Sequence, residues 1–420
     1  MRRVVGILRE TCSSWERRAP LAPNHVETLV KTLGVDVIVQ PSDRRVFSDD
    51  EYRAAGAVVA EDLSPASAVL GVKAVPLDTV RALRGRTLAF FSHTVKGQEH
   101  AMPLLDACIA QGIRLVDYEC VRANGNAAAP RLLAFGEFAG KAGMVDALWG
   151  LGLRLQALGH ESPLADLGQA WTHRDYPSAC AALRALGARV ATEGLPAAVA
   201  PVVVGIAGRG NVGRGALHAL EQLGEDALTM VAPRDLSGLA AAAAADPETA
   251  RRRVYGCVLG PEHLYAAVAG PGAAWAGAPF NRAHFRGHPE LYASVFARRV
   301  LPHLTCLVTA FAWDARSPRI LTRDDLRAAG DGRKLLAVAD LTCDVDGAVE
   351  ALVRTTTLDE PFLVYDPATG VATPGVQGPG LAVMGVDILP AELPREASAA
   401  FGDALLPFVP ALADPEVAER

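Results

Sequence analysis

The 420-residue sequence lacks the features that mark several large classes of protein. Its lysines and arginines form no basic cluster and the net charge is −6, so we expect neither nucleic acid nor a membrane surface as partner. No apolar run approaches the length of about 18 residues that a transmembrane helix needs. The N-terminal segment reaches Arg9 before the apolar stretch of a signal peptide forms. We therefore expect a cytoplasmic protein that acts on small molecules.

Cysteine and histidine are also too scattered to suggest disulfides or a metal centre. The seven cysteines are odd in number and include no C-x-x-C pair, which is typical of reduced thiols in the cytosol. The ten histidines contain no H-E-x-x-H motif, so we expect no metal. What remains is an ordinary globular composition, 50% hydrophobic and 21% charged, in a chain long enough for two domains.

The most informative motif is an apolar run that leads directly into G-x-G-x-x-G. Residues 202–207 predict a buried parallel strand, and residues 216–223 predict a helix that ends at a glycine. The first glycine would permit a tight turn, the second would let a pyrophosphate approach the backbone, and the third would let the helix pack closely on the strand. The pyrophosphate would bind free N–H groups at the start of the helix. The predicted cofactor-binding residues are Gly208, Gly210, Asn211, Val212 and Gly213.

The residue that would distinguish NADPH from NADH follows the next predicted strand, 227–232. In NAD enzymes an acidic residue about 20 positions further on accepts hydrogen bonds from the ribose 2′-OH. No acid ends this strand; Arg234 stands there instead and could meet a 2′-phosphate. We therefore predict NADP(H) in preference to NAD(H). The alternative is that Arg234 is an exposed loop residue and that Asp235 binds the ribose.

The N-terminal region alternates predicted strands and helices, which indicates a mostly parallel sheet with helices on both faces. Ligands bind such sheets beyond the carboxyl ends of the strands. Lys73 follows the predicted strand 68–72, and His93 follows the predicted strand 87–91. We therefore expect these two titratable side chains to face one cleft.

The predicted architecture is α/β, with two Rossmann-like doubly wound domains and the active site in the cleft between them. A helix rich in glycine and alanine, 138–157, leads into a turn-rich segment where we place the first boundary. The dinucleotide-binding domain would span 156–354. Residues 1–155 and about 355–420 would form the substrate domain, which is discontinuous because the last segment is too short to form a domain of its own.

Several further motifs, in a fixed order, give the chain a resemblance to a known family. They lie at 15–23, 40–45, 90–94, 134–136, 142–144, 320–323, 340 and 393–397. Through them the whole chain resembles the lysine:2-oxoglutarate reductase half of the bifunctional aminoadipate-semialdehyde synthases. It resembles more distantly the fungal saccharopine dehydrogenases and the alanine dehydrogenase/transhydrogenase superfamily. Because the sequence ends soon after the last motif, we do not expect the glutamate-forming dehydrogenase half.

The resemblance implies a reductive condensation in which the ε-amine of L-lysine joins 2-oxoglutarate and NADPH reduces the imine to saccharopine. Lys73 and His93 match the family's acid–base pair, and histidine titrates near neutrality. Guanidinium groups suit a substrate with several carboxylates, although an isolated arginine is also common in surface ion pairs. The substrate-binding residues implied by the resemblance are Arg18, Lys96, Glu119, Arg131 and Asp340.

Two departures from the family leave the amine substrate open. Thr309 stands where relatives carry asparagine, and the segment 122–130 is recast with alanines. An opine-type reductase that uses ornithine or another amine is therefore an alternative. So is an amino-acid dehydrogenase similar to alanine dehydrogenase, which would depend on ammonia. A non-catalytic NADPH-binding module would not need Lys73 and His93. The sequence leaves a monomer and a homo-oligomer equally open.

Overall fold

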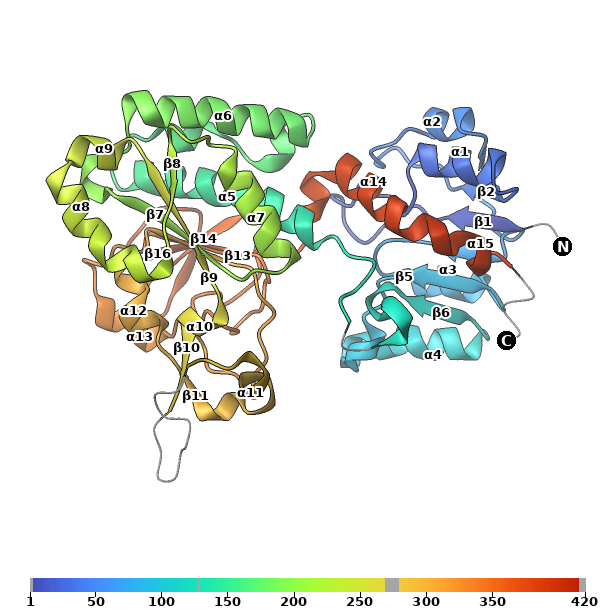
Figure 1. Ribbon diagram of the computed structural model, residues 1–420. Helices are drawn as coiled ribbons and strands as arrows, with labels where there is room; N and C mark the ends of the chain where they lie inside the picture. Colours follow the sequence, from blue (N-terminus) through green and yellow to red (C-terminus); the bar gives the residue numbers. More distant parts are fainter. Residues whose placement is uncertain (1–2, 127–128, 269–278, 415–420) are drawn as a thin grey trace. The chain divides into compact units, whose positions relative to one another are not determined.

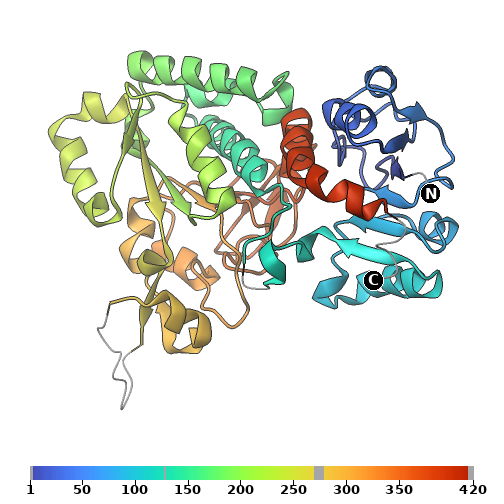
Figure 2. The same ribbon diagram turned by 45° about the vertical axis from the view of Figure 1, so that its right-hand side comes forward.

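The structure, a computed structural model, describes residues 3–126, 129–268 and 279–414. The chain divides into two compact units: unit 1 comprises Met1–Phe135 and Pro390–Arg420, and unit 2 comprises Gly136–Leu389. In each unit, helices cover both faces of a central sheet (Figures 1 and 2). The predicted α/β class with two doubly wound sheets is confirmed. In the described residues, no helix combines the length and the apolar character needed to cross a membrane.

Unit 1 is built on a parallel sheet. Its described strands are β1 (Val4–Ile7), β2 (Asp36–Val39), β3 (Val58–Val59), β4 (Ala68–Leu70), β5 (Thr87–Phe90) and β6 (Arg114–Asp117). Its described helices are α1 (Pro23–Lys31), α2 (Asp49–Ala54), α3 (Leu77–Ala82), α4 (Met102–Ala110), α14 (Pro394–Leu405) and α15 (Val409–Leu412). The strand order is β3-β2-β1-β4-β5-β6, the usual doubly wound order, which reverses between β1 and β4. A ligand crevice is expected at that reversal, beyond the carboxyl ends of the strands.

The C-terminal helix α14 is fixed to the start of the chain by hydrogen bonds within unit 1. The backbone N–H of Ala19 donates to Ser398 Oγ at 2.9 Å, and His25 Nε2 lies 2.9 Å from Asp403 Oδ1. Gly402 lies against the ring of His25, where a Cβ would overlap it. These contacts explain why the last segment of the chain belongs to the same unit as the first.

Unit 2 is built on a larger, mixed sheet. Its described strands are β7 (Val202–Ala207), β8 (Leu228–Met230), β9 (Val254–Leu259), β12 (Cys306–Thr309), β13 (Ala337–Asp340), β14 (Phe362–Tyr365), β15 (Ala372–Pro374) and β16 (Leu381–Met384), with a separate antiparallel pair, β10 (Tyr265–Ala267) and β11 (Tyr292–Ser294). Its described helices are α5 (Gly136–Ala157), α6 (Tyr176–Glu193), α7 (Asn211–Glu221), α8 (Leu239–Ala245), α9 (Pro247–Arg251), α10 (Pro261–Leu264), α11 (Arg282–Gly287), α12 (Phe296–Arg299) and α13 (Arg323–Ala329).

The strand order in this sheet is β15-β14-β16-β13-β12-β7-β9-β8. Strands β16, β13, β12, β7, β9 and β8, which are consecutive in this order, run parallel to one another. Strands β14 and β15 extend the sheet with antiparallel pairs. In the usual dinucleotide-binding order, the strand that follows the first helix lies directly beside the first strand. Here β9 occupies that place along the whole of β7, and β8 lies beyond it at the edge.

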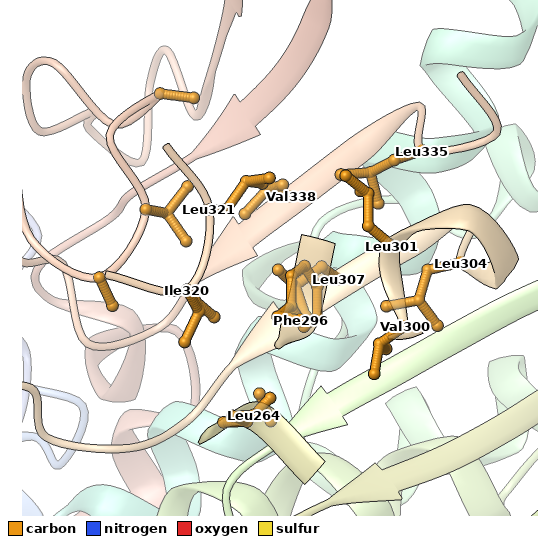
Figure 3. Close-up of a cluster of buried hydrophobic side chains, with 14 of the residues drawn as sticks. Leu264, Phe296, Val300, Leu301, Leu304, Leu307, Ile320, Leu321, Leu335 and Val338 are labelled. Atoms are coloured by element: carbon orange, nitrogen blue, oxygen red, sulfur yellow. The ribbon is translucent and has the colours of Figure 1, made fainter. Parts of the chain in front are cut away.

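A core of apolar side chains fills one face of this sheet in unit 2 (Figure 3). Phe296 of α12 and Leu307 of β12 are completely buried, and Val338 of β13 is almost completely buried. Ile320 and Leu321, from the segment before α13, lie in the same cluster. Removal of this apolar area from water is the main force that holds α12 and α13 to the sheet.

Helix α5 lies close to α7 on the other face because glycines remove the side chains that would separate them. A Cβ on Gly140 would overlap the carbonyl oxygen of Val212, and a Cβ on Gly215 would overlap that of Glu137. Glycine disfavours helices by about 1 kcal/mol relative to alanine. Close backbone packing therefore explains why glycine stands in the middle of this helix.

The two units differ from the boundaries expected near residues 155 and 355. Helix α5 packs on α7 and on β13, and so belongs to unit 2. Strands β14 and β16 pair with each other, and β16 pairs with β13, so residues 355–389 also belong to unit 2. Hydrophobic periodicity predicts that these segments are buried elements, but it does not say which sheet buries them.

Candidate functional site

The glycine loop between β7 and α7 has the geometry of a phosphate cradle. Gly208 has φ +127°, which disfavours a side chain, and a Cβ there would overlap Ala310 O. A Cβ on Gly213 would overlap Gly208 O, so this glycine lets α7 begin close to the loop. A Cβ on Gly210, in contrast, would have no atom of the described residues within 4 Å. Gly208 and Gly213 therefore shape the loop, and Gly210 leaves open space above it.

That open space lies at the start of α7, whose first helical residue is Asn211. The first N–H groups of a helix have no partner inside the helix and carry partial positive charge. Those of Asn211, Val212 and Gly213 are therefore available to a phosphate approaching over Gly210. These residues fit the pyrophosphate of a dinucleotide.

The structure places Arg234 further from this loop than the sequence pattern implied. Arg234 follows β8 at the edge of the sheet; its side chain is 87% exposed and its Nε lies 3.8 Å from Asp235 Oδ2. The strand beside the glycine loop is β9. Beyond its end, Glu262 forms an ion pair of 2.6 Å with Arg209, which stands between the first two glycines of the loop. Sequence reasoning missed this pair because Glu262 is distant from the glycine motif along the chain.

In unit 1, titratable residues follow four neighbouring parallel strands at their carboxyl ends. Glu10 follows β1, Lys73 follows β4, His93 follows β5 and Glu119 follows β6. Glu10 links the segment after β1 to the segment after β4, where the strand order reverses. Its carboxylate accepts the N–H of Val72 at 2.6 Å and that of Lys73 at 3.0 Å. The prediction that Lys73 and His93 follow adjacent strands is confirmed.

Glu119 is the centre of a cluster of basic side chains. Its carboxylate lies 2.9 Å from Arg131 Nη1, 3.2 Å from His93 Nδ1 and 3.8 Å from Lys96 Nζ. Burial alone would raise the pKa of Glu119, but the charge of Arg131, with His93 and Lys96, lowers it overall. Glu119 is therefore an anion, and it brings together three other residues that the family resemblance implied.

His93 is held in an unusual backbone conformation. Its φ is +57°, in the left-handed region that non-glycine residues seldom adopt, and such residues are concentrated at functional sites. Its ring stacks on that of Phe91 with centroids 6.3 Å apart, and its side chain is partly exposed. The imidazole is thus oriented between a buried carboxylate and solvent.

Arg18 lies in a buried ion pair. Its Nε and Nη2 contact the two carboxylate oxygens of Glu16 at 2.7 and 2.6 Å, and its guanidinium lies 4.3 Å from the centre of the Phe135 ring. Burial would lower the pKa of Arg18, but the charge of Glu16 outweighs it and raises the pKa. The side chain that the resemblance assigned to a substrate carboxylate therefore already has an internal partner.

Glu10 was missed by the sequence analysis. Burial raises its pKa to about 7, helped by the nearby Glu16 and opposed by the N–H groups of Val72 and Lys73. Glu10 and Lys73 line one pocket, together with residues that include Gln40. An acid directly after the first strand of a parallel sheet was the available signal, because that strand borders the reversal of strand order.

Asp340 ends β13 in unit 2 and is completely buried. Its Oδ1 accepts hydrogen bonds from the hydroxyls of Thr309 and Thr342, each at 2.7 Å, whereas its Oδ2 has no hydrogen-bond partner among the described residues. Burial raises the pKa of Asp340 despite these hydrogen bonds. Thr309, the departure from the family's asparagine, thus serves to hold this carboxyl group.

The described residues contain no group of three or more His, Cys, Asp or Glu side chains that could hold a metal. One histidine pair, His284 and His288, does have the H-x-x-x-H spacing, which the expectation of scattered histidines overlooked. Their Nδ1 atoms lie 3.0 Å from Tyr292 Oη and 3.3 Å from Glu290 Oε1, respectively. These neighbours account for the pair without a metal.

The chain is similar in sequence to several known proteins. Residues 6–140 match the family described as alanine dehydrogenase/PNT, N-terminal domain. The chain is 36% identical to the mitochondrial alpha-aminoadipic semialdehyde synthase of Mus musculus, over 97% of this chain and 43% of that protein. It is 27% identical to the saccharopine dehydrogenase [NAD(+), L-lysine-forming] of Candida glabrata, over 95% of this chain and 89% of that protein.

A solved L-alanine dehydrogenase has a similar fold, with a TM-score of 0.57 and 18% identity over 98% of this chain and 90% of that chain. At this identity the likeness concerns the fold alone. The chain spans less than half the length of the mouse synthase. Together these matches confirm the resemblance that the motifs indicated.

Proposed function

We propose that this chain, which is similar to the aminoadipic semialdehyde synthases over 97% of its length, joins L-lysine to 2-oxoglutarate by NADPH-dependent reduction, with saccharopine as product. The observation that carries the proposal is the set of residues at the carboxyl ends of the strands in unit 1. An imidazole, an amine and carboxylates lie there beside partly exposed cations that share the Glu119 carboxylate, which is the chemistry that amine condensation between carboxylate-rich substrates requires.

Formation of the imine needs proton transfers at two points, and the residues of unit 1 supply groups for both. A base takes a proton from the ε-ammonium of lysine, so that its nitrogen attacks the ketone carbon of 2-oxoglutarate. An acid then protonates the hydroxyl that leaves as water, and an imine forms. We assign these transfers to Lys73 and His93, with Glu119 holding His93 at 3.2 Å. Bound nicotinamide supplies the hydride that reduces the imine carbon, and saccharopine, oxidised cofactor and one water result.

Substrate carboxylates are assigned to the cations around Glu119. The side chains of Lys96 and Arg131 are 46% and 42% exposed and share the Glu119 carboxylate. Guanidinium binds a carboxylate through two parallel N–H bonds, so Arg131 is the stronger candidate. Arg18 keeps its proposed substrate role, in which the Glu16 pair would orient the guanidinium, and Asp340 keeps its proposed place near the nicotinamide or the incoming amine.

The preference for NADPH over NADH is also part of the proposal. It is supported by Arg209, which stands in the glycine loop and lies beyond the end of β9, the strand adjacent to β7. The Candida glabrata relative is named for NAD(+), so the preference requires a direct test. The cytoplasmic location stays a prediction, since the mouse relative is named as mitochondrial. Small molecules are the proposed partners, and the oligomeric state stays open.

A spectrophotometric assay tests the proposal. Purified protein is mixed with 2-oxoglutarate, NADPH and one amine, and loss of the reduced nicotinamide is followed. Oxidation that requires both L-lysine and 2-oxoglutarate is the expected result. Oxidation with ornithine in place of lysine would identify an opine-type reductase with a different amine site. Oxidation with ammonium and a keto acid alone would place the chain with the amino-acid dehydrogenases and contradict the proposal.

A further inference from the structure

The exchange of β8 and β9 in the sheet of unit 2 changes which residue can reach the adenosine ribose. In a dinucleotide-binding sheet the ribose lies beyond the end of the strand adjacent to the glycine-loop strand. That neighbour is β9, which pairs with β7 from Val202↔Val254 to Ala207↔Leu259. Strand β8 is one strand further out, about 10 Å from β7, because neighbouring strands lie about 4.8 Å apart.

Arg209 and Glu262 occupy the end of β9. The N–H of Gly208 donates to Leu259 O at 2.9 Å, so the glycine loop rests directly on this strand end. The guanidinium of Arg209 extends sideways from the loop over Gly260, where a Cβ would lie 2.7 Å from Nη1, and reaches Glu262 Oε1 at 2.6 Å. The Arg209 side chain is 53% exposed and that of Glu262 is 36% exposed, so both are accessible to a ligand.

We infer that the Arg209–Glu262 pair reads the 2′ position of the adenosine ribose and that Arg209, rather than Arg234, selects for a 2′-phosphate. This inference rests on the proposed function in that it requires a dinucleotide on the glycine loop. The 2′-phosphate replaces Glu262 as the partner of the Arg209 guanidinium, since two negative groups compete for one fork of N–H donors. Glu262 keeps Arg209 in place in the free protein and limits its affinity for phosphate.

The neighbouring groups support this assignment. His263 Nδ1 accepts the N–H of Gly260 at 3.0 Å, and burial lowers the pKa of His263, so its ring is neutral at physiological pH. Burial would raise the pKa of Glu262, but a backbone hydrogen bond and the charge of Arg209 lower the pKa overall, so Glu262 is an anion. Arg209 is therefore the cation that faces the strand end, and Glu262 is its counter-ion. Arg234, by contrast, contacts Asp235 and extends into solvent.

Dissociation constants of NADPH and NADH for the full-length protein, measured by nucleotide fluorescence without amine or keto acid, test the inference. We expect Arg209→Gln to weaken NADPH binding by about 10- to 100-fold, the range for a lost charge-assisted hydrogen bond, and NADH binding by less than about threefold. Glu262→Gln should leave NADPH binding equal or tighter and should weaken NADH binding. Arg252→Gln, a change at an exposed arginine of unit 2, is the matched control for charge.

Two results would overturn the inference while leaving the proposed function intact. One is an Arg209→Gln protein that retains the wild-type preference for NADPH over NADH, together with an Arg234→Gln protein that loses this preference. The other is an Arg209→Gln protein that binds both nucleotides equally weakly, which would assign Arg209 to the shared pyrophosphate. If the unaltered protein binds neither nucleotide, the cofactor in the proposed function is wrong and this inference fails with it.

Discussion

At the scale of single residues, Glu119 and His93 set the chemistry of the candidate site. Glu119 is buried and paired with Arg131 and Lys96, and His93 is held beside it in a left-handed conformation. The sequence marked His93 because it follows a predicted strand of a parallel sheet, and the family resemblance implied Glu119. It could not show that Glu119 is the shared partner of the others, since that depends on the strand order β4-β5-β6.

A glutamine at position 93 tests the acid–base role of the histidine. Glutamine has similar polarity but carries no titratable proton, so we expect His93→Gln to lower kcat by about 10²- to 10⁴-fold, the usual contribution of a general acid–base group. The pH dependence near neutrality should flatten, while the NADPH dissociation constant stays unchanged. A variant that keeps its rate and pH profile would remove His93 from the mechanism.

Glu10 gives a prediction for stability as a function of pH. Its pKa is raised from 4.5 to about 7 in the folded protein, so folding favours its neutral form. The contribution of this shift to stability is full below pH 4.5 and is lost as the pH rises through about 7. Between pH 4.5 and about 7, we expect the free energy of unfolding of Glu10→Gln to vary by about 1–3 kcal/mol less than that of the wild type, because one pKa unit corresponds to about 1.4 kcal/mol.

Denaturant unfolding at about pH 5 and about pH 8 measures this difference. The variant loses one of two backbone hydrogen bonds and should be less stable than the wild type at the lower pH. The difference in stability between the variant and the wild type should become smaller or change sign at the higher pH. Equal differences at both pH values would mean that Glu10 does not titrate in this range.

At the scale of elements, the sequence predicted the two strands of unit 1 that precede Lys73 and His93 to within two residues. Short apolar runs give such strands directly, as for β4 and β5. The adjacency of β9 and β7 was not predictable, because β8 and β9 are both short apolar segments after α7 and only pairing decides their order. The consequence is functional, since the predicted phosphate ligand Arg234 follows the wrong strand for the usual geometry.

For the stability of a Gly140→Ala variant, the packing of α5 on α7 and helix propensity lead to opposite predictions. Propensity alone favours Gly140→Ala by about 1 kcal/mol. The structure places the new Cβ on the backbone of α7, so we expect a loss of about 1–3 kcal/mol or more in the free energy of unfolding. Gly332→Ala, where a Cβ meets no described atom within 4 Å, is the control and should change stability by less than about 0.5 kcal/mol. A more stable Gly140→Ala protein would contradict the close approach.

The glycine loop gives a matching prediction for binding. A Cβ on Gly210 meets open space, so Gly210→Ala should unfold at the same temperature as the wild type. The same Cβ occupies the position of the pyrophosphate, so NADPH binding should weaken by at least about tenfold. Thermal unfolding and fluorescence titration measure the two effects. A stable variant with unchanged NADPH affinity would mean that the dinucleotide does not lie over this loop.

At the scale of the whole molecule, the proposed function gives each unit a separate task. Unit 1 would supply proton transfer and carboxylate recognition at the ends of β1, β4, β5 and β6, and unit 2 would supply the nucleotide site at the end of β7. The same division, a substrate domain and a dinucleotide-binding domain, is expected from the sequence. The boundaries were less predictable, because the burial of α5 and of β14 to β16 depends on partners distant in the chain.

The most direct test of the central claim is the identity of the product. Protein, L-lysine labelled with ¹⁵N at the ε position, 2-oxoglutarate and NADPH are incubated, and the products are analysed by mass spectrometry. We expect a single new compound that contains the carbon skeletons of both substrates, retains the label in the secondary amine that links them, and forms in equal amount to the NADPH consumed. Labelled ammonia, labelled glutamate or no joined product would contradict it.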